Sequence, residues 1–426
     1  MRSKLIAVAI AAGLGVTSFT VAAAPAQHKS HKSQATAPAP AVNSEVELLK
    51  AQLAQLQAKV DSLEQRTDAQ SDINVSTGQA VEKATNVTAA SSKTIASLEK
   101  AINNTKLSGK MYFDVTGIDQ KNSDTGKTNA SGVGTDVKRF YFSVDHKFND
   151  IWSANLTTDF NYSSSDKTTN LFVKKAYVQG KFNDAAVLRI GSADMPWIPF
   201  VENYYGFRYV ENTVTDRLHY GNSADWGMHL GGNIGANKMF DYAVSVVNGN
   251  GYKNPSRSKG VDVEGRVGFK PMDNMIVAVG AYNGHRGQDF QTASAVNTAQ
   301  RQDIMVAYAD KTIRAGAEYF TAKNWNNVTS PLTDKADGYS VWGSVAVADD
   351  ISLFARYDNT KLSKTLDHSA KDTYYNFGVE YQVTKGFKLA AVWKHEDGDK
   401  SVSAPIPPHV QTIKTNEIGI WGEVKF

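Results

Sequence analysis

The spacing of apolar positions along the chain changes from a helical period to a strand period near residue 107. Upstream of that point, apolar side chains recur at alternating intervals of three and four residues, which is typical of a coiled-coil seam. The seam consists of Val46, Leu49, Leu53, Leu56, Val60 and Leu63, then Val81 and Ala84, and finally Ile95, Leu98 and Ile102. The same phase crosses the polar positions Thr67, Gln70, Asn74 and Thr77 without an insertion. The pattern fits either one continuous helix or two short coils joined by a polar linker.

This helical region should begin at Ser44, because Ser44 and Glu47 have the spacing of a capping box. A single apolar stripe is unstable in water, so the helix needs partner helices. We therefore expect residues 44–105 to form a coiled-coil stalk in a homotrimer.

Downstream of residue 107, apolar side chains recur at every second position. Phe140, Phe142 and Val144 share one face of a predicted strand, while Arg139 and Tyr141 lie on the other. The same alternation returns at 261–270 and 375–383. One face suits lipid and the other suits water, which is typical of the strands of a transmembrane β-barrel.

The connections between the predicted strands alternate strictly between short and long. The short turns are rich in Asn, Asp and Gly and fall at 149–150, 183–184, 235–237, 271–274, 310–311, 349–350 and 385–386. The longer polar segments lie near 117–134, 161–169, 193–224, 248–259, 286–301, 324–336, 361–371 and 396–412. Seven turns and eight loops join sixteen strands. A soluble sandwich has no reason to keep every second connection short, so the sequence predicts an all-β transmembrane barrel of 16 antiparallel strands behind an α-helical coiled-coil segment.

The N-terminus has the organisation of a secretory signal peptide. Arg2 and Lys4 precede an apolar stretch that ends in small residues at 22–24. We expect a signal peptide at 1–24, a disordered linker at 25–43, a periplasmic stalk at 44–105 and an outer-membrane β-barrel at 106–426. In a Gram-negative cell the barrel would contact outer-membrane lipid, and the stalk could contact the cell wall.

The composition excludes several other classes of protein. A mean hydropathy of -0.38 with 21% charged residues is inconsistent with a helical membrane protein. The net charge of +3 gives no reason to expect a nucleic-acid partner. The sequence has no cysteine and none of the common catalytic motifs, and His28 and His31 stand in a polar tail. We therefore expect no enzyme activity, no metal and no cofactor.

A barrel of sixteen strands leaves an aqueous channel, so passive diffusion of small solutes or ions is the expected function. The longest loop, 193–224, carries too many aromatic residues for a loop exposed to solvent. If it folds inward, its charged side chains would form a constriction of Glu202, Arg208, Glu211, Asp216 and Arg217. The alternative is a loop packed on the rim of the barrel.

Strand alternation also predicts which charged side chains line the pore. These are the basic residues Arg139, Lys175, Arg189, Arg266, Arg314 and Arg356 and the acidic residues Glu264 and Glu380. Acidic and basic positions on this face are nearly equal in number, so ion selectivity does not follow from the count.

The stretch 188–232 resembles the phosphate-selective porin O and P family. The resemblance rests on the Gly191-x-x-x-x-Pro196 turn, on Phe200 and Glu202, and on the return from Tyr220-Gly221 to Gly227. It implies a trimeric 16-stranded channel with an inward third loop, selective in some members for phosphate. The chain departs from the family at 192–194, where Ser-Ala-Asp replaces a basic residue. The chain also resembles siderophore porins that join a coiled coil to a barrel, so a specific channel for a siderophore or a phosphate-like anion is the alternative to a general porin.

Overall fold

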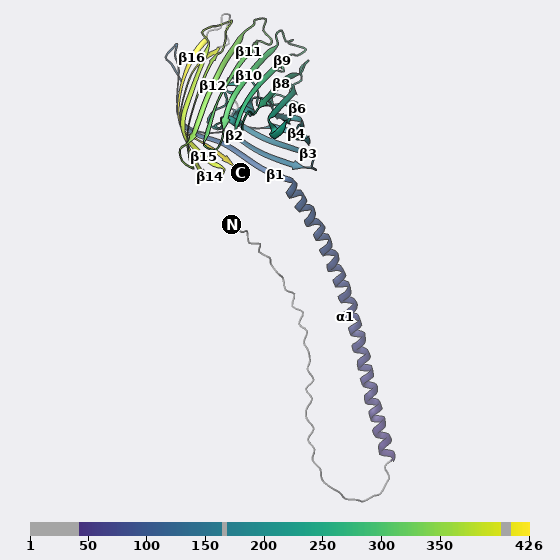
Figure 1. Ribbon diagram of the computed structural model, residues 1–426. Helices are drawn as coiled ribbons and strands as arrows, with labels where there is room; N and C mark the ends of the chain where they lie inside the picture. Colours follow the sequence, from purple (N-terminus) through teal and green to yellow (C-terminus); the bar gives the residue numbers. More distant parts are fainter. Residues whose placement is uncertain (1–41, 164–167, 402–409) are drawn as a thin grey trace. The chain divides into compact units, whose positions relative to one another are not determined.

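The computed structural model describes residues 42–163, 168–401 and 410–426. The expected signal peptide at 1–24 lies outside the described residues, as does the expected linker at 25–43 except for its last two residues. The described chain contains a long N-terminal helix and a β-barrel (Figure 1). Among the described residues, no helix is both long and apolar enough to cross a membrane.

Helix α1, Val42–Asn104, runs for 63 residues without a break, which favours the continuous form of the predicted coil. The helix begins at Val42 and not at Ser44, so the predicted start is wrong by two residues. Ser44 and Glu47 lie within its first turns. Glu47 forms an ion pair with Lys50 at 3.1 Å instead. The apolar seam is exposed along its length in the single chain, with Leu56 64% exposed. The helix ends at Asn104, one residue before the predicted boundary.

The barrel consists of sixteen antiparallel strands, which confirms the predicted fold class. The strands are β1 (Thr105–Asn122), β2 (Thr128–Lys147), β3 (Trp152–Ser163), β4 (Thr168–Asn183), β5 (Ala186–Asp194), β6 (Ala224–Ile234), β7 (Phe240–Val247), β8 (Asp262–Phe269), β9 (Met275–Gly284), β10 (Ala299–Ala309), β11 (Ile313–Lys323), β12 (Lys335–Ala346), β13 (Ile351–Lys361), β14 (Lys371–Thr384), β15 (Phe387–Ser401) and β16 (Val410–Lys425). Strand β1 pairs with β16 and closes the sheet, with Met111 opposite Val424. Closure gives each described strand a hydrogen-bonded neighbour on both sides, as a barrel in lipid requires.

All seven predicted turns are confirmed, because each joins two consecutive strands, with Asn183 itself the last residue of β4. The first long loop is wrong. Strands β1 and β2 extend far beyond the expected ends, so the connection shrinks from 117–134 to 123–127. The residues in these extensions are polar. Outside the bilayer a strand pair is held by backbone hydrogen bonds, so it does not require apolar side chains.

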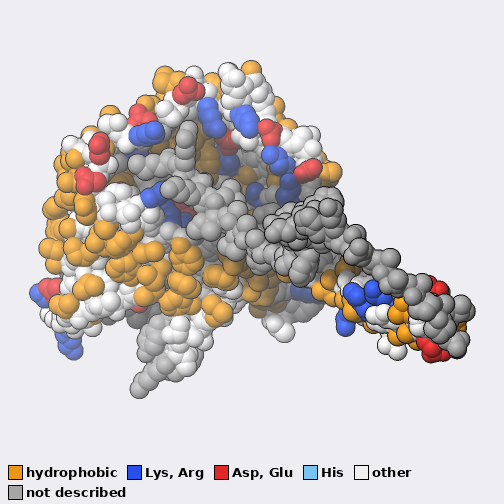
Figure 2. All heavy atoms as spheres, turned by 90° about the horizontal axis from the view of Figure 1, so that it is seen from below, with side chains coloured by type: hydrophobic (Ala, Val, Ile, Leu, Met, Phe, Trp, Pro, Cys, Tyr) orange, Lys and Arg blue, Asp and Glu red, His pale blue; other side chains and the backbone are white. Residues whose placement is uncertain are grey.

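The two faces of the sheet differ as the alternation predicts. Outward side chains such as Val178, Ile190 and Val279 are apolar and about half exposed. Figure 2 shows hydrophobic side chains gathered over a broad area of the barrel surface, with charged side chains toward its border. The inward side chains surround a buried cluster that includes Trp197, Val201 and other residues of the loop between β5 and β6.

Candidate pore site

The site is built around residues 195–223, which connect β5 to β6 and are called the L3 segment below. This segment contains helix α2 (Ile198–Tyr205) and the single-turn helix α3 (Val214–Arg217). Pro199 stands in the first turn of α2, where its missing N–H costs nothing. Gly206 ends the helix with φ of 82°, and an added Cβ would meet the side chain of Arg314 at 3.2 Å. A left-handed conformation in such close contact favours glycine.

The barrel wall holds the L3 segment through its backbone. The carboxylate of Glu264 accepts a hydrogen bond from the Trp197 N–H at 2.8 Å. The Arg314 guanidinium donates to the carbonyl oxygen of Asn203 at 3.0 Å. Further wall donors reach Pro196 O from Arg266 (3.0 Å), Asn212 O from Arg356 (2.5 Å), Val210 O from Lys394 (3.4 Å) and Tyr220 O from Arg301. Because these wall residues come from five different strands, β8, β10, β11, β13 and β15, the segment lies inside the barrel against its inner surface.

Aromatic side chains of the L3 segment pack against the same wall. Phe207 stacks on Phe354 with ring centroids 4.1 Å apart. The guanidinium of Arg266 lies 3.5 Å from the ring centroid of Phe200, within cation–π range. The hydroxyl of Tyr209 donates to Glu380 at 2.7 Å. The aromatic content that sequence analysis found unusual for a loop therefore fills space inside the barrel.

Three of the five predicted constriction residues lie together. Arg208 forms ion pairs with Glu202 at 2.5 Å and with Asp216 at 3.4 Å, all within the L3 segment. Burial would lower the pKa of Arg208, but the two carboxylates raise it above its ordinary value. Arg208 therefore stays charged, and it shares that charge with two acidic neighbours.

The other two predicted constriction residues contact the wall. Arg217 reaches three carboxylates, those of Asp358 (3.3 Å), Asp372 (2.5 Å) and Glu396 (2.8 Å). Glu211 pairs with Lys394 at 3.2 Å. Both residues fix the position of the L3 segment, and the Arg217 side chain is only 8% exposed.

The eight predicted pore-lining residues all project to the inside of the barrel, but they have two different environments. Arg266, Arg314, Arg356, Glu264 and Glu380 contact the L3 segment, as described above. The remaining three bind neighbours on the wall: Arg139 binds Asp159 (3.2 Å), Lys175 binds Asp194 (2.5 Å) and Arg189 binds Gln179 (2.8 Å). These three lie on strands β2, β4 and β5.

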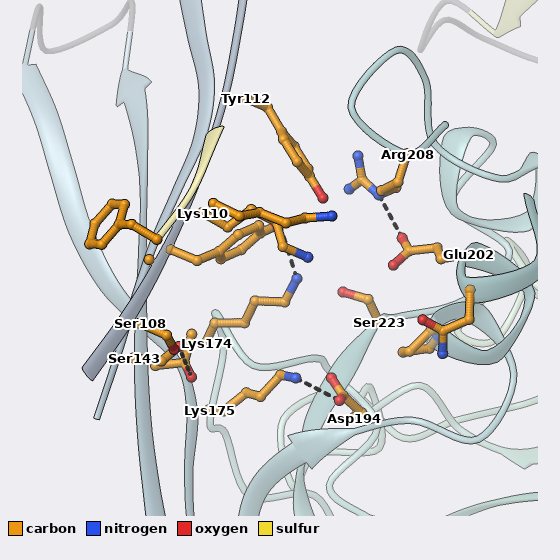
Figure 3. Close-up of a pocket in the computed structure, with 17 residues that line it drawn as sticks. Ser108, Lys110, Tyr112, Ser143, Lys174, Lys175, Asp194, Glu202, Arg208 and Ser223 are labelled. Carbon is orange, nitrogen blue, oxygen red and sulfur yellow. Dashed lines mark hydrogen bonds and ion pairs between the residues drawn. The ribbon is translucent and has the colours of Figure 1, made fainter. Parts of the chain in front are cut away.

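A cavity of about 400 Å³ separates α2 from the wall formed by β1 to β5 (Figure 3). Its charged lining is mostly basic. The cationic side chains are Lys110, Lys174, Lys175, Arg208 and Lys425, and the acidic side chains are Asp194 and Glu202. Of this set, Lys175, Arg208 and Glu202 were predicted from the sequence.

Two β-bulges explain part of what sequence analysis missed. On β2, Arg139 pairs with Tyr112 and Val137 with Phe113, so Lys138 is left without a partner. On β4, Lys174 is passed over in the same way between Val173 and Lys175. Each bulge turns two consecutive basic residues inward, whereas strict alternation would place one of them on the lipid side.

The signal for these bulges was present in the sequence. A lysine facing lipid near the middle of the bilayer costs about 2–4 kcal/mol. The adjacent basic pairs at 138–139 and 174–175 therefore conflict with a regular strand. Arg301 is 1% exposed and joins Glu264 to Tyr220. Its role could not be predicted, because alternation places a residue on the lumen face but does not show which lumen residues contact the loop.

A family model described as Gram-negative porin matches residues 80–401, more than half of the chain. A search of curated proteins gave no match. The matched family covers porins in general, so the resemblance to phosphate-selective porins stays a prediction.

Three solved structures illustrate the similarity of fold. An anion-selective porin from Comamonas acidovorans is 12% identical, with a TM-score of 0.53 over 76% of this chain and 99% of that one. OprB from Pseudomonas putida is 11% identical, with a TM-score of 0.53 over 77% and 95%. The trimer form of OmpT from Vibrio cholerae is 16% identical, with a TM-score of 0.50 over 76% and 99%. At these identities the likeness establishes the barrel fold alone.

Proposed function

Since the chain belongs to the Gram-negative porin family and is a channel of the outer membrane, we propose that small hydrophilic solutes and ions diffuse passively through its barrel past a constriction made by the L3 segment. The observation that carries this proposal is the cavity between α2 and strands β1 to β5, bounded on one side by Glu202 and Arg208 and on the other by Lys110 and Lys174. Polar and charged groups line it on both sides, as an aqueous pathway requires.

Bilayer recordings with a substitution that narrows this cavity test the proposal. Ser143 lines the cavity, and its hydroxyl lies 2.8 Å from that of Thr157. Ser143→Trp should reduce single-channel conductance because the indole would occupy part of the space. Val178→Trp, on the outward face, is the matched control and should conduct like the wild type. An unchanged conductance in a folded Ser143→Trp barrel would place the conducting path elsewhere.

We also propose that the protein is a homotrimer whose three α1 helices form the periplasmic stalk. The exposed apolar seam of α1 supports this assembly, because three helices would bury it. The stalk would then be available for contact with the cell wall, and the barrel would contact outer-membrane lipid. A signal peptide at 1–24 would direct export.

The alternative function is a channel specific for a siderophore or a phosphate-like anion. The basic lining of the cavity favours an anionic solute. Conductance measured with competing solutes distinguishes a general porin from a specific channel, since only the latter should saturate at low solute concentration.

A further inference from the structure

The bulge on β4 places two lysines in the cavity with different partners. Lys175 forms an ion pair with Asp194 at 2.5 Å, so its charge is balanced. Lys174 is 9% exposed, and its ammonium contacts the Tyr141 hydroxyl at 3.2 Å and the rings of Tyr141 and Tyr252. Among the residues that the structure describes, no carboxylate oxygen lies within 4.0 Å of the Lys174 ammonium.

Lys110, on β1, is a second cation of this kind in the same cavity. Its ammonium lies 5.9 Å from the ring centroid of Tyr112 and, within the described parts of the chain, has no carboxylate partner inside 4.0 Å. In the register of the sheet it stands opposite another cation, Lys425. A partly buried charge without a counter-charge has an unfavourable free energy. The ammonium groups of Lys110 and Lys174 therefore favour a mobile anion as their partner.

The acidic side chains that line the cavity already have cationic partners. Asp194 is paired with Lys175, and Glu202 is paired with Arg208 at 2.5 Å. Figure 3 shows Lys110, Lys174 and Ser223 projecting toward the same space, with the Arg208–Glu202 pair across from the wall. The hydroxyl of Ser223 adds a neutral donor next to the two ammonium groups.

Basic residues continue beyond this space toward the β7–β8 loop. Lys253 of that loop lies over the ring of Phe172 at 4.7 Å. Burial, followed by the positive charge of Arg139, lowers the pKa of Lys253. An anion entering from this side would therefore meet positive charge before it reaches Lys174.

We propose that Lys110, Lys174 and Ser223 form a subsite for small oxyanions within the pore, so that the channel prefers anions to cations. The recognised chemistry is a compact group of anionic oxygens, as in sulfate or a short carboxylate, which accepts hydrogen bonds from two ammonium groups and a hydroxyl. The inference rests on the proposed function, because the subsite matters for permeation only if the cavity belongs to the conducting path.

Bilayer recordings of the full chain test the subsite with chloride, sulfate and succinate. In a KCl gradient, the wild type should show an anion-preferring reversal potential, and the double variant Lys110→Gln and Lys174→Gln should move it toward cations. Sulfate or succinate should reduce the chloride current, and Lys174→Gln should weaken this block about tenfold, as for loss of one charge-assisted hydrogen bond. Lys174→Arg should retain the block, and Lys311→Gln, in an exposed turn, is the matched control.

The outcomes separate this inference from the proposed function. Block by both sulfate and succinate supports the shared oxyanion chemistry, and block by one alone supports a subsite for that class. A double variant that folds and keeps the wild-type reversal potential and block overturns the subsite. If Ser143→Trp still lowers conductance in that case, the pathway stands without the subsite, whereas an unchanged Ser143→Trp channel removes both.

Discussion

The carboxylate of Glu264 accepts a hydrogen bond from the Trp197 N–H at 2.8 Å, at the start of the L3 segment. The same carboxylate forms an ion pair with Arg301 at 3.1 Å, and Arg301 donates to the carbonyl oxygen of Tyr220 at the end of the segment. One buried ion pair on β8 and β10 thus holds both ends of L3. Asp303 completes the cluster with two contacts of 2.9 Å to Arg301.

Replacing Arg301 should loosen the L3 segment. Arg301→Met would leave the buried carboxylates of Glu264 and Asp303 without their cation. Removal of one partner of a buried ion pair destabilises a folded protein by about 3–5 kcal/mol. We expect larger fluctuations of the open-channel current and a higher mean conductance in bilayer recordings. Arg189→Met is the matched control, since its guanidinium binds Gln179 on the wall. Quiet currents of wild-type size in Arg301→Met would show that other contacts suffice to hold the loop.

The turns place the β1–β2 loop and the β4–β5 turn at opposite ends of the barrel. Because the chain has no native cysteine, a single introduced thiol reports its own position. Ser123→Cys should react with a membrane-impermeant maleimide on intact cells, and Asn183→Cys should react only after the outer membrane is permeabilised. Labelling of Asn183→Cys in intact cells would reverse the topology.

The sequence predicted most of the fold because the two dominant signals are local. Turn residues such as Asn149 and Gly386 and the alternation of strand residues report on neighbours in sequence, and both were read correctly. The end of β1 and the start of β2 were predicted wrongly, because the extension of both strands into 117–134 depends on the pairing between them. Polar side chains in an extended hairpin are indistinguishable from those of a loop.

The candidate site was harder to predict, because contacts across the lumen depend on distant residues. Arg217 looked like a constriction residue by its place in a charged loop, yet it contacts carboxylates more than 140 positions away. Lys174 could have been found from the adjacent basic pair that it forms with Lys175. The role of Arg301 could not have been predicted, because it depends on the path of the L3 segment and its own strand carries no feature that indicates it.

The seam of α1 should be accessible to cross-linking between subunits if the helices form a trimeric stalk. Leu56→Cys, at a seam position, should give disulfide-linked chains under mild oxidation of the full-length protein. Ala58→Cys, on the opposite side of the helix, should give far fewer because the thiols would point away from one another. Native mass spectrometry should report three chains. Equal cross-linking at both positions, or a monomer, would contradict the stalk.

The state of Glu211 should make one attachment of the L3 segment sensitive to acid. Burial alone would raise the pKa of this carboxyl group, but Lys394 and the more distant Lys138 lower it well below its ordinary value. A carboxyl group whose pKa is lowered in the folded state stabilises that state. This contribution is present in full above the unfolded-state pKa of about 4.3, and it is lost as the pH falls through the lower folded-state pKa. The contact with Lys394 should therefore persist from neutral pH to well below the ordinary glutamate pKa of about 4.3.

Glu211→Gln tests this reasoning by removing the charge at every pH. At neutral pH the variant should show larger open-channel fluctuations than the wild type, because Lys394 loses its ion pair with Glu211, while its contact with Glu417 at 2.8 Å remains. As the pH falls through the depressed pKa, the wild type should approach the variant, since protonation removes the same charge. Asp145→Asn, which changes a lumen carboxylate that binds Asn155 at 2.8 Å on the wall, is the control. A difference between Glu211→Gln and the wild type that grows in acid, or that is missing at neutral pH, would show that this ion pair does not hold the segment.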